Sequence, residues 1–524
     1  MKIIFCTGGV MSSLGKGITI ASLAMLLKSR GYRVTVLKCD PYLNVDAGTM
    51  SPYQHGEVFV TFDGAETDLD LGHYERFLNE NLSGVNNLTS GKVYWEIIAR
   101  ERRGEYLGAT VQVVPHVVDL IKEKIYSFEA TGVDFLLVEI GGTVGDIEGL
   151  PFLEAARQIL NEREKDAATL HVSYVPFLET SGEFKTKPTQ HSVKELLGLG
   201  IKPTFLVARA KYRFDDVVAD KLAKFCNVKK ERVFIAYDAP SIYEVPMILE
   251  EQGLAKKVLE YFGEGFGELG NYFKKWREFT LQYNELKREE NKKRVAIVGK
   301  YVDLPDAYLS VSEALIHASV AEKKPINVDF ISSEREDLKS VLSKYDGIVI
   351  PGGFGDRGVE GKIMAIRFAR ENDVPLLGLC LGMQCILIEF ARNVLGYSNA
   401  NSTEFTKECV PVVDRLVEYD ASTKGGTMRL GAFPVKIVDD YLKRIYSGDL
   451  IYERHRHRYG YNNIFRDEFE RKGLLVAAVS VDERIVEAIV LPDKRFFVGV
   501  QYHPEFASRP LEAHPLFVEF VRRL

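Results

Sequence analysis

In the first half of the chain, continuous apolar runs alternate with segments whose apolar residues recur at helical spacing. The runs predict strands at residues 2–7, 33–39, 135–140, 170–175, 204–208 and 233–237. Between the first two strands, the spacing predicts a helix over residues 17–30, with Gly31 as its stop. Apolar strands separated by helices are typical of a mostly parallel sheet that is covered on both faces.

The pattern changes at residues 271–294, which are densely charged and contain few β-branched residues. This composition predicts a solvent-exposed helix and linker at a domain boundary. New strands are then predicted at residues 294–299, 328–332, 347–351 and 376–379, and residues 476–505 predict a β-meander that runs into a His-Pro-Glu turn. We therefore predict an α/β domain at 1–268, a charged helical linker at 269–293 and a second α/β domain, with mixed strand pairing, at 294–524.

Length and composition narrow the class of protein. The 524 residues allow about two to four domains, and a net charge of −6 gives no indication of binding to bulk nucleic acid or to an anionic membrane. No apolar run reaches the roughly 18–20 residues that span a bilayer, and the N-terminal MKIIFCTGGVMSS predicts a strand rather than a signal peptide. The six cysteines have no regular spacing, which excludes a disulfide framework and favours the cytosol.

A glycine-rich segment, GGVMSSLGKG (residues 8–17), lies between the first predicted strand and the first helix. Its glycines let backbone N–H groups approach an anion, the helix N-terminus adds positive potential, and Lys16 supplies a charge. The segment departs from the usual phosphate loop, because five residues separate Gly9 from Gly15 and Gly17 replaces the Ser or Thr that ligates magnesium. The alternative is a plain glycine-rich turn, and a phosphate site here needs other magnesium ligands.

Two carboxylates are candidates for those ligands. Glu139 ends the apolar run FLLVE, at the edge of the sheet where α/β proteins bind ligands, and magnesium takes one or two carboxylates together with phosphate oxygens. Asp70, in DGAETDLDLGHYERF, is equally well explained as a solvated loop residue. Lys38 ends the second strand and adds a charge that phosphate can use, although such lysines are often only solvated. The tract KTKPTQ (residues 185–190) is as readily an exposed loop as a ligand site.

The segment GLCLG (residues 378–382) carries the clearest chemistry in the second domain. Small residues around a nucleophile permit the sharp strand-to-helix turn that presents it, and the following helix N-terminus favours the thiolate of Cys380. The N–H of Leu381 is predicted to face a developing oxyanion, with a second donor from the Pro-Gly-Gly at 351–353. Cys385, on the next helix among apolar neighbours, is predicted to be an inert core thiol.

A cysteine nucleophile needs a base, and VGVQYHPEF offers His503 and Glu505 two positions apart. In an extended chain such residues share a face, so the carboxylate can orient the imidazole. Taken singly, a buried cysteine is common and His-Pro-Glu can be a surface turn. Their occurrence in this order within one domain favours a Cys–His–Glu triad.

Taken together, the sequence motifs of the two domains resemble those of known protein families. The second domain resembles class I glutamine amidotransferases, whose triad matches Cys380, His503 and Glu505, and the first resembles the synthetase domain of the CTP synthase family. The matching stretches cover essentially the whole chain and include CTGGVMSSLGKGI, DGAETDLDLGHYERF, VEIGGTVGDIEGLPFLEA, KTKPTQHSVKEL, PGGFGDRGVEGK, LGLCLGMQ, NSTEF, GGTMRLG and ERHRHRY. The resemblance implies an N-terminal phosphate-loop (dethiobiotin synthetase-like) parallel-sheet domain followed by a class I glutamine amidotransferase α/β domain.

The resemblance also implies an activity: ATP-dependent amination of UTP to CTP through a 4-phosphorylated UTP, with ammonia from glutamine hydrolysis. It implies Mg²⁺ as cofactor, GTP as activator, CTP as feedback inhibitor, and a cytoplasmic homotetramer, a dimer of dimers, that binds neither nucleic acid nor membrane.

Site residues carry over by motif. The positions that match ATP contacts are Ser13, Leu14, Gly15, Lys16, Gly17, Ile18, Asp70, Tyr237, Asp238 and Ala239. Among these, the match at residues 237–239 is the loosest. Lys38 is added as a further residue that helps to bind the phosphates. Positions matching UTP or CTP contacts are Ser12, Asp146, Ile147, Glu148, Lys185, Thr186, Lys187, Pro188, Thr189, Gln190 and Lys221. Positions matching the glutamine pocket are Gly353, Leu381, Gly382, Met383, Gln384, Glu404 and Arg458. Asp70 and Glu139 match the metal ligands, and Arg357 and Glu360 are assigned to a lid.

Two other functions stay open from the sequence. One is a different glutamine-dependent ligase with the same two domain types, such as a cobyrinic acid amide synthase, which the tracts GDIEG and KTKPTQ disfavour. The other is a deviant phosphate-loop ATPase that positions macromolecules and carries a degenerate glutaminase. An intact triad disfavours that second alternative.

Overall fold

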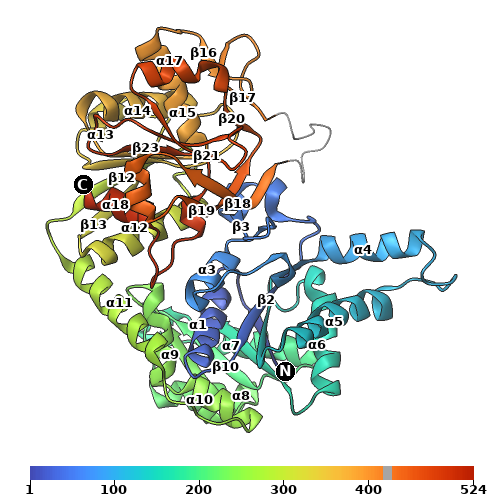
Figure 1. The fold of residues 1–524 in the computed structure, drawn as a ribbon. Coiled ribbons are helices and arrows are strands. Elements are labelled where there is room, and N and C mark those ends of the chain that lie inside the picture. The colour runs from blue at the N-terminus through green and yellow to red at the C-terminus, as the bar shows by residue number, and fades with distance from the viewer. Residues whose placement is uncertain (417–427) are drawn as a thin grey trace. The chain divides into compact units, whose positions relative to one another are not determined.

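The computed structural model describes residues 1–416 and 428–524, so residues 425–427 of the motif GGTMRLG lie outside it. The described chain forms two compact units (Figure 1). Unit 1 comprises residues 1–46 and 73–280, and unit 2 comprises residues 47–72 and 281–524. The predicted domain boundaries stay a prediction, and this division differs from them chiefly in assigning residues 47–72 to unit 2.

Unit 1 is built on a seven-stranded sheet in which every neighbouring pair is parallel. In spatial order the strands are β11 (Val233–Tyr237), β10 (Phe205–Ala210), β7 (Ala167–Tyr174), β1 (Lys2–Gly9), β6 (Phe135–Ile140), β2 (Val34–Asp40) and β5 (Asn87–Thr89). The parallel sheet and its six predicted strands are confirmed. The short edge strand β5 was missed because three residues, two of them polar, give no apolar run.

The first helix, α1 (Lys16–Lys28), is also present as predicted, but it is buried on almost every side. Its outer surface is covered by α9 (Val245–Glu251) and α10 (Leu254–Phe262). The remaining helices of eight or more residues that lie at least partly in unit 1, apart from α11 described below, are α3 (Asp70–Leu78), α4 (Ser90–Arg102), α5 (Val118–Tyr126), α6 (Leu150–Glu162), α7 (Lys187–Gly198) and α8 (Asp216–Cys226). In Figure 1, α4 and the loop after it extend away from the sheet of unit 1.

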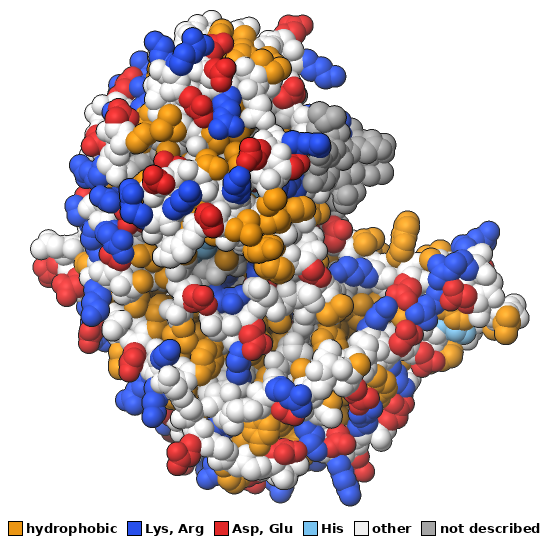
Figure 2. Space-filling model, in the orientation of Figure 1, with side chains coloured by type: hydrophobic (Ala, Val, Ile, Leu, Met, Phe, Trp, Pro, Cys, Tyr) orange, Lys and Arg blue, Asp and Glu red, His pale blue; other side chains and the backbone are white. Residues whose placement is uncertain are grey.

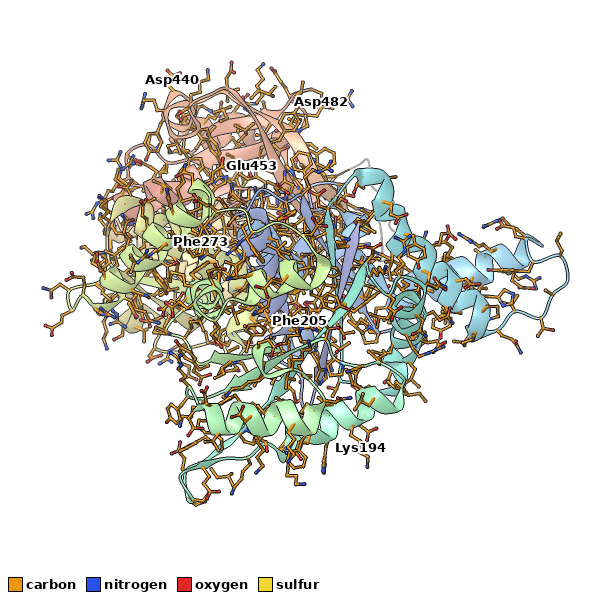
Figure 3. The ribbon with its side chains drawn as sticks, turned by 90° about the horizontal axis from the view of Figure 1, so that it is seen from below. Lys194, Phe205, Phe273, Asp440, Glu453 and Asp482 are labelled. Carbon is orange, nitrogen blue, oxygen red and sulfur yellow. The ribbon has the colours of Figure 1, made fainter. Side chains whose placement is uncertain are left out.

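The charged segment near residue 280 forms α11 (Asn271–Arg288), which carries the labelled Phe273 in Figure 3. The predicted helix is present and mostly exposed or half-buried, but one stripe of it is buried. Trp276 and Phe279 are buried, and the indole N–H of Trp276 donates to the carbonyl of Tyr243 at 2.9 Å. The many charged residues of the segment hid one apolar stripe on a helix that is otherwise polar. No helix in the two described stretches is both long and apolar enough to cross a membrane.

Unit 2 contains a nine-stranded sheet, and its mixed strand pairing confirms the prediction. Its parallel part, in spatial order, is β13 (Ile326–Ser332), β12 (Lys293–Gly299), β14 (Gly347–Ile350), β15 (Leu376–Leu379) and β23 (Phe497–Val500). Antiparallel strands continue it with β22 (Val486–Val490), β21 (Leu475–Ser480), β18 (Arg429–Ile437) and β19 (Leu450–His457). One face packs against α14 (Val359–Asn372) and α15 (Leu381–Phe390), and the other against α12 (Leu309–Glu322) and α18 (Pro515–Arg522).

Residues 47–72 join unit 2 through polar contacts. The carboxylate of Glu57 accepts hydrogen bonds from the backbone N–H and the hydroxyl of Ser310. Arg456 on β19 donates to Glu66 at 2.7 Å, and Arg454 donates to the carbonyl of Val60 at 2.9 Å. Since these contacts join side chains roughly 250–390 residues apart, no local pattern in the sequence indicates them.

We predict that Trp276→Ala lowers the free energy of unfolding by about 3–5 kcal/mol, because it removes a buried aromatic side chain and leaves the Tyr243 carbonyl with only the 3.3 Å hydrogen bond from Thr280. Urea unfolding followed by circular dichroism measures the change. Trp95→Ala is the matched control, because Trp95 is 71% exposed. Equal midpoints for the two variants would contradict the packing of α11.

Candidate functional site

Cys380 lies at a sharp turn between β15 and α15, where its backbone has φ 50° and ψ −101°. A residue with a side chain rarely adopts positive φ, so the surrounding structure must hold this conformation. The flanking glycines make the turn sterically feasible: a Cβ at Gly382 would lie 2.2 Å from the carbonyl oxygen of Ile350. The strand-to-helix turn that the sequence predicted is therefore present.

The thiol of Cys380 is buried and has two polar neighbours. The side-chain amide of Gln501 donates to its sulfur at 3.6 Å, and the sulfur lies 3.8 Å from the carbonyl oxygen of Arg456. Sequence reasoning missed both residues, although Gln501 stands only two positions before His503. These groups give the sulfur a defined position at the N-terminus of α15.

His503 is held by Glu505 through a 2.7 Å contact between Nδ1 and Oε1. The predicted pairing is present. The two residues pair across a 3₁₀ turn, Pro504–Phe506, so the expectation that they share a face of an extended chain was wrong. The ring of Phe506 stacks on the imidazole at 5.1 Å. Within the described chain, Nε2 of His503 has no hydrogen-bond partner, which leaves it able to exchange a proton with a substrate.

The charge state of His503 follows from its neighbours. Burial acts to lower its pKa, but the carboxylate of Glu505 and the thiolate of Cys380 outweigh burial and raise the pKa to about 10. The imidazole therefore holds a proton at neutral pH. An imidazolium at this position stabilises negative charge on a sulfur nucleophile beside it.

Gly352 lies directly beside this pair, after the end of β14. A Cβ at this position would come within 2.8 Å of Cε1 of His503 and 3.7 Å of the Cβ of Cys380. No group of residues 1–416 or 428–524 accepts from the N–H of Gly352 or Gly353. The N–H of Leu381, in the first turn of α15, also has no partner within the helix. These backbone donors are suited to an oxyanion.

Other predicted glutamine-pocket residues occur in the same unit. Gln384 donates to the carbonyl of Tyr459 at 3.0 Å, and Glu404 accepts the N–H of Gly355 at 2.9 Å. Burial raises the pKa of Glu404, while the hydrogen bond from Gly355 and the nearby charges of Lys300 and Arg458 oppose that rise. A cavity of about 240 Å³ borders His503, Glu505 and the two glycines, and residues of the 47–72 segment form part of its wall.

The two residues assigned to a lid are tethered. Arg357 donates to the hydroxyl of Tyr53 at 3.0 Å and to the carbonyl of Lys300 at 3.2 Å. Glu360, in the first turn of α14, accepts two 2.9 Å hydrogen bonds from Arg392. The loop is thus closed onto its surroundings in this structure.

In unit 1, the glycine-rich segment links β1 to α1 with positive φ at Val10, Ser13 and Gly15. Successive turns of this kind direct backbone N–H groups into a concave anion site. The ammonium of Lys16 donates to the carbonyl of Gly142 at 2.8 Å, just beyond the carboxyl end of β6. The predicted phosphate loop therefore has a geometry suited to an anion.

Glu139 is buried at the end of β6, where Lys38 approaches its carboxylate at 3.1 Å and the hydroxyl of Tyr74 donates to its other oxygen. Lys38 also lies 3.8 Å from Asp40. The ammonium of Lys38 therefore contacts carboxylates in this structure, and its expected role toward a phosphate stays a prediction. Asp70 is the first residue of α3, one turn before Tyr74.

The carboxylates of Asp70 and Glu139 suit a magnesium ion that arrives together with a nucleotide. The described ranges contain no group of three or more His, Cys, Asp or Glu residues able to cage a metal. Magnesium needs only one or two carboxylates when phosphate oxygens and water complete its octahedron. Asp70 and Glu139 are carboxylates, the type of ligand that such a magnesium ion requires.

The remaining predicted nucleotide contacts of unit 1 emerge mainly from neighbouring strands. Because β7, β1 and β6 are adjacent and parallel, the segments after them begin at the same edge of the sheet. Residues 187–190 begin α7, and Lys185 and Thr186 lie in the short segment before it. The hydroxyl of Thr189 donates to the carbonyl of Tyr174 at 2.7 Å, so the tract is not simply an exposed loop. Asp146, Ile147 and Glu148 form an exposed turn after β6. Lys221 is exposed on α8, and Asp238, which follows β11, pairs with Arg209.

Comparison with known proteins covers nearly the whole chain. Residues 2–263 match the family model "CTP synthase N-terminus", and residues 303–523 match "Glutamine amidotransferase class-I". A CTP synthase of Caldanaerobacter subterraneus is 54% identical over 531 residues, covering 100% of this chain and 98% of that protein. A CTP synthase of Aquifex aeolicus is 53% identical, with 99% and 98% covered. The solved glutaminase domain of Trypanosoma brucei CTPS with bound acivicin is 38% identical and covers 44% of this chain and 93% of that one, with a TM-score of 0.42.

We predict that Glu505→Gln lowers the pKa of His503, because the carboxylate that stabilises the imidazolium is lost. Cys380 then loses part of its counter-charge, and its alkylation by iodoacetamide at pH 7 slows by roughly tenfold. The rate of inactivation measured from pH 5 to 10 checks this. Glu483→Gln, which removes an exposed carboxylate paired with Lys436, is the control. An unchanged rate in Glu505→Gln would refute the ion pair.

Proposed function

The chain belongs to the CTP synthase family of glutamine-hydrolysing ligases, and from that premise we propose how its residues divide the reaction. Unit 1 activates UTP with ATP, unit 2 releases ammonia from glutamine, and the ammonia replaces O4 of UTP to give CTP. The observation that carries the proposal is the buried Cys380–His503–Glu505 set, which occurs in one chain with a phosphate-loop sheet.

Activation of UTP is needed because the oxygen at C4 of uracil is a poor leaving group. Transfer of the γ-phosphoryl group of ATP to O4 converts it into a phosphate, which ammonia displaces. The loop before α1 would bind the ATP phosphates through its backbone N–H groups, and Lys16 would neutralise charge on the transferred group. Asp70 and Glu139 would hold Mg²⁺, which when bound adds further positive charge at the phosphates.

Glutamine hydrolysis begins when the sulfur of Cys380 attacks the side-chain amide carbon. The N–H groups of Gly352 and Leu381 stabilise the oxyanion, and the imidazolium of His503 gives its proton to the departing ammonia. A thioester remains, and His503 then accepts a proton from the water that hydrolyses it. Glu505 keeps the imidazole in the required orientation and protonation state.

Ammonia must be kept from bulk water, where it takes up a proton and loses its nucleophilic electron pair. The cavity of about 240 Å³ in unit 2 borders His503 directly. We therefore propose that this cavity receives the ammonia as it forms. Its walls include Glu57, Val58 and Arg456.

The same proposal extends to regulators and assembly. Ser12, residues 146–148 and 185–190, and Lys221 would bind UTP as substrate or CTP as inhibitor, and GTP would act as activator through the loop that carries Arg357 and Glu360. A homotetramer is supported by exposed apolar side chains on α4 and the loop after it, where Trp95 is 71% and Leu107 is 94% exposed. Figure 2 shows apolar side chains on this projecting segment. All six cysteines are free thiols, which supports a cytoplasmic location.

We predict that Cys380→Ala abolishes CTP formation with glutamine, since no thioester can form, and preserves it with added ammonium chloride. Assays of UTP, ATP and each nitrogen donor measure this. Cys385→Ala is the matched control, because it removes a buried thiol five positions later on α15. Equal losses with both donors in Cys380→Ala would contradict separate sites, and no CTP from the wild-type protein with either donor would favour another ligase.

We predict that Glu139→Gln and Asp70→Asn each reduce CTP formation with both nitrogen donors by about 100-fold or more, because the metal loses a negatively charged ligand. Hydrolysis of glutamine measured without UTP should change little. Glu154→Gln, which removes a carboxylate paired with Arg157 on α6, is the control. Ammonia-dependent turnover at the wild-type rate would contradict the metal role.

A further inference from the structure

Lys362, on α14, is a buried cation without a carboxylate partner. Its side chain is 1% exposed, and its one hydrogen bond in the described chain runs from Nζ to the carbonyl of Pro351 at 3.2 Å. Burial lowers the pKa of Lys362 to about 8, so the amine still carries a proton at neutral pH. A buried, uncompensated ammonium is costly to keep, and the mechanism above does not use it.

The bond from Lys362 constrains one particular peptide group. The carbonyl of Pro351 belongs to the same planar trans peptide as the N–H of Gly352, and in such a peptide the two groups point in opposite directions. Lys362 does not line the cavity beside His503, whereas Gly352 does. Lys362 holds the carbonyl of the Pro351–Gly352 peptide on its own side. The N–H of Gly352, at the opposite side of that peptide, therefore points toward the cavity.

The other end of this loop is held in the same manner. Lys300 donates to the carbonyl of Phe354, and Glu404 accepts the N–H of Gly355, so both sides of that peptide are fixed. The peptides between are formed by two glycines, whose backbone conformation is the least restricted of any residue. Among the described residues, Lys362 is therefore the group that fixes the peptide next to Cys380.

We propose that Lys362 is a positioning residue for the release of ammonia from glutamine. It holds the Pro351–Gly352 peptide so that the N–H of Gly352 faces the oxyanion, and its charge polarises that peptide into a stronger donor. When Cys380 attacks, the sulfur–carbon bond forms and the carbonyl electron pair moves to oxygen, while Lys362 keeps its proton throughout. This inference rests on the proposed glutaminase function of unit 2.

The test is Lys362→Met, which keeps the length of the side chain and removes the charge and the donor. We expect kcat for glutamine hydrolysis to fall by roughly 10- to 100-fold, somewhat less than loss of an oxyanion donor itself, with KM within about twofold. CTP formation from ammonia should be unchanged. Inactivation of the glutaminase by iodoacetamide should also be unchanged, because alkylation of Cys380 forms no oxyanion.

Lys324→Met is the matched control, since Lys324 also donates to a single backbone carbonyl of unit 2, that of Arg522 at 2.9 Å. Wild-type hydrolysis in Lys362→Met overturns the inference. A fall in the iodoacetamide rate parallel to kcat also overturns it, because Lys362 would then support the thiolate. If Lys362→Met loses ammonia-dependent activity, Lys362→Gln is judged by the same criteria. A wild-type protein that hydrolyses no glutamine overturns the proposed function instead.

Discussion

Parallel alignment of neighbouring strands is the constraint on which both sites depend. In unit 2, β14, β15 and β23 are adjacent and parallel, so the glycine pair, Cys380 and His503 all follow strands that end at one edge. In unit 1, the same rule brings together the segments after β7, β1 and β6. The chemistry of each unit thus comes from loops whose relative places are set by backbone hydrogen bonds within a sheet.

Buried charge is the second shared feature. Glu139 with Lys38, and Glu505 with His503, are carboxylates whose cost of burial is offset by a cation at hydrogen-bond distance. Removal of one partner from such a pair typically costs about 3–5 kcal/mol because the other charge remains buried. Such paired groups hold fixed positions before substrate arrives, and preorganised charge of this kind is what stabilises a transition state.

Much of the fold was accessible from the sequence because apolar runs and glycine-flanked turns are local signals. The strands of unit 1, the turn at Cys380 and the His503–Glu505 pairing all belong to this class. The buried face of α11 was not found, because Trp276 and Phe279 stand among many charges. The docking of residues 47–72 and the contact of Lys38 with Glu139 were also missed, since both join groups that are distant in sequence. Gln501 and Lys362 make side-chain hydrogen bonds that leave no pattern in the sequence.

The assignment of residues 47–72 to unit 2 has a consequence for protein synthesis. Glu66 and its partner Arg456 are separated by 390 residues, so the ribosome adds Glu66 to the chain long before Arg456. At about 5–20 residues per second, the interval is roughly 20–80 s. During that time the segment that lines part of the cavity beside His503 lacks its partners on β19. The nascent chain must therefore carry it unfolded, or held by a chaperone, until β19 emerges.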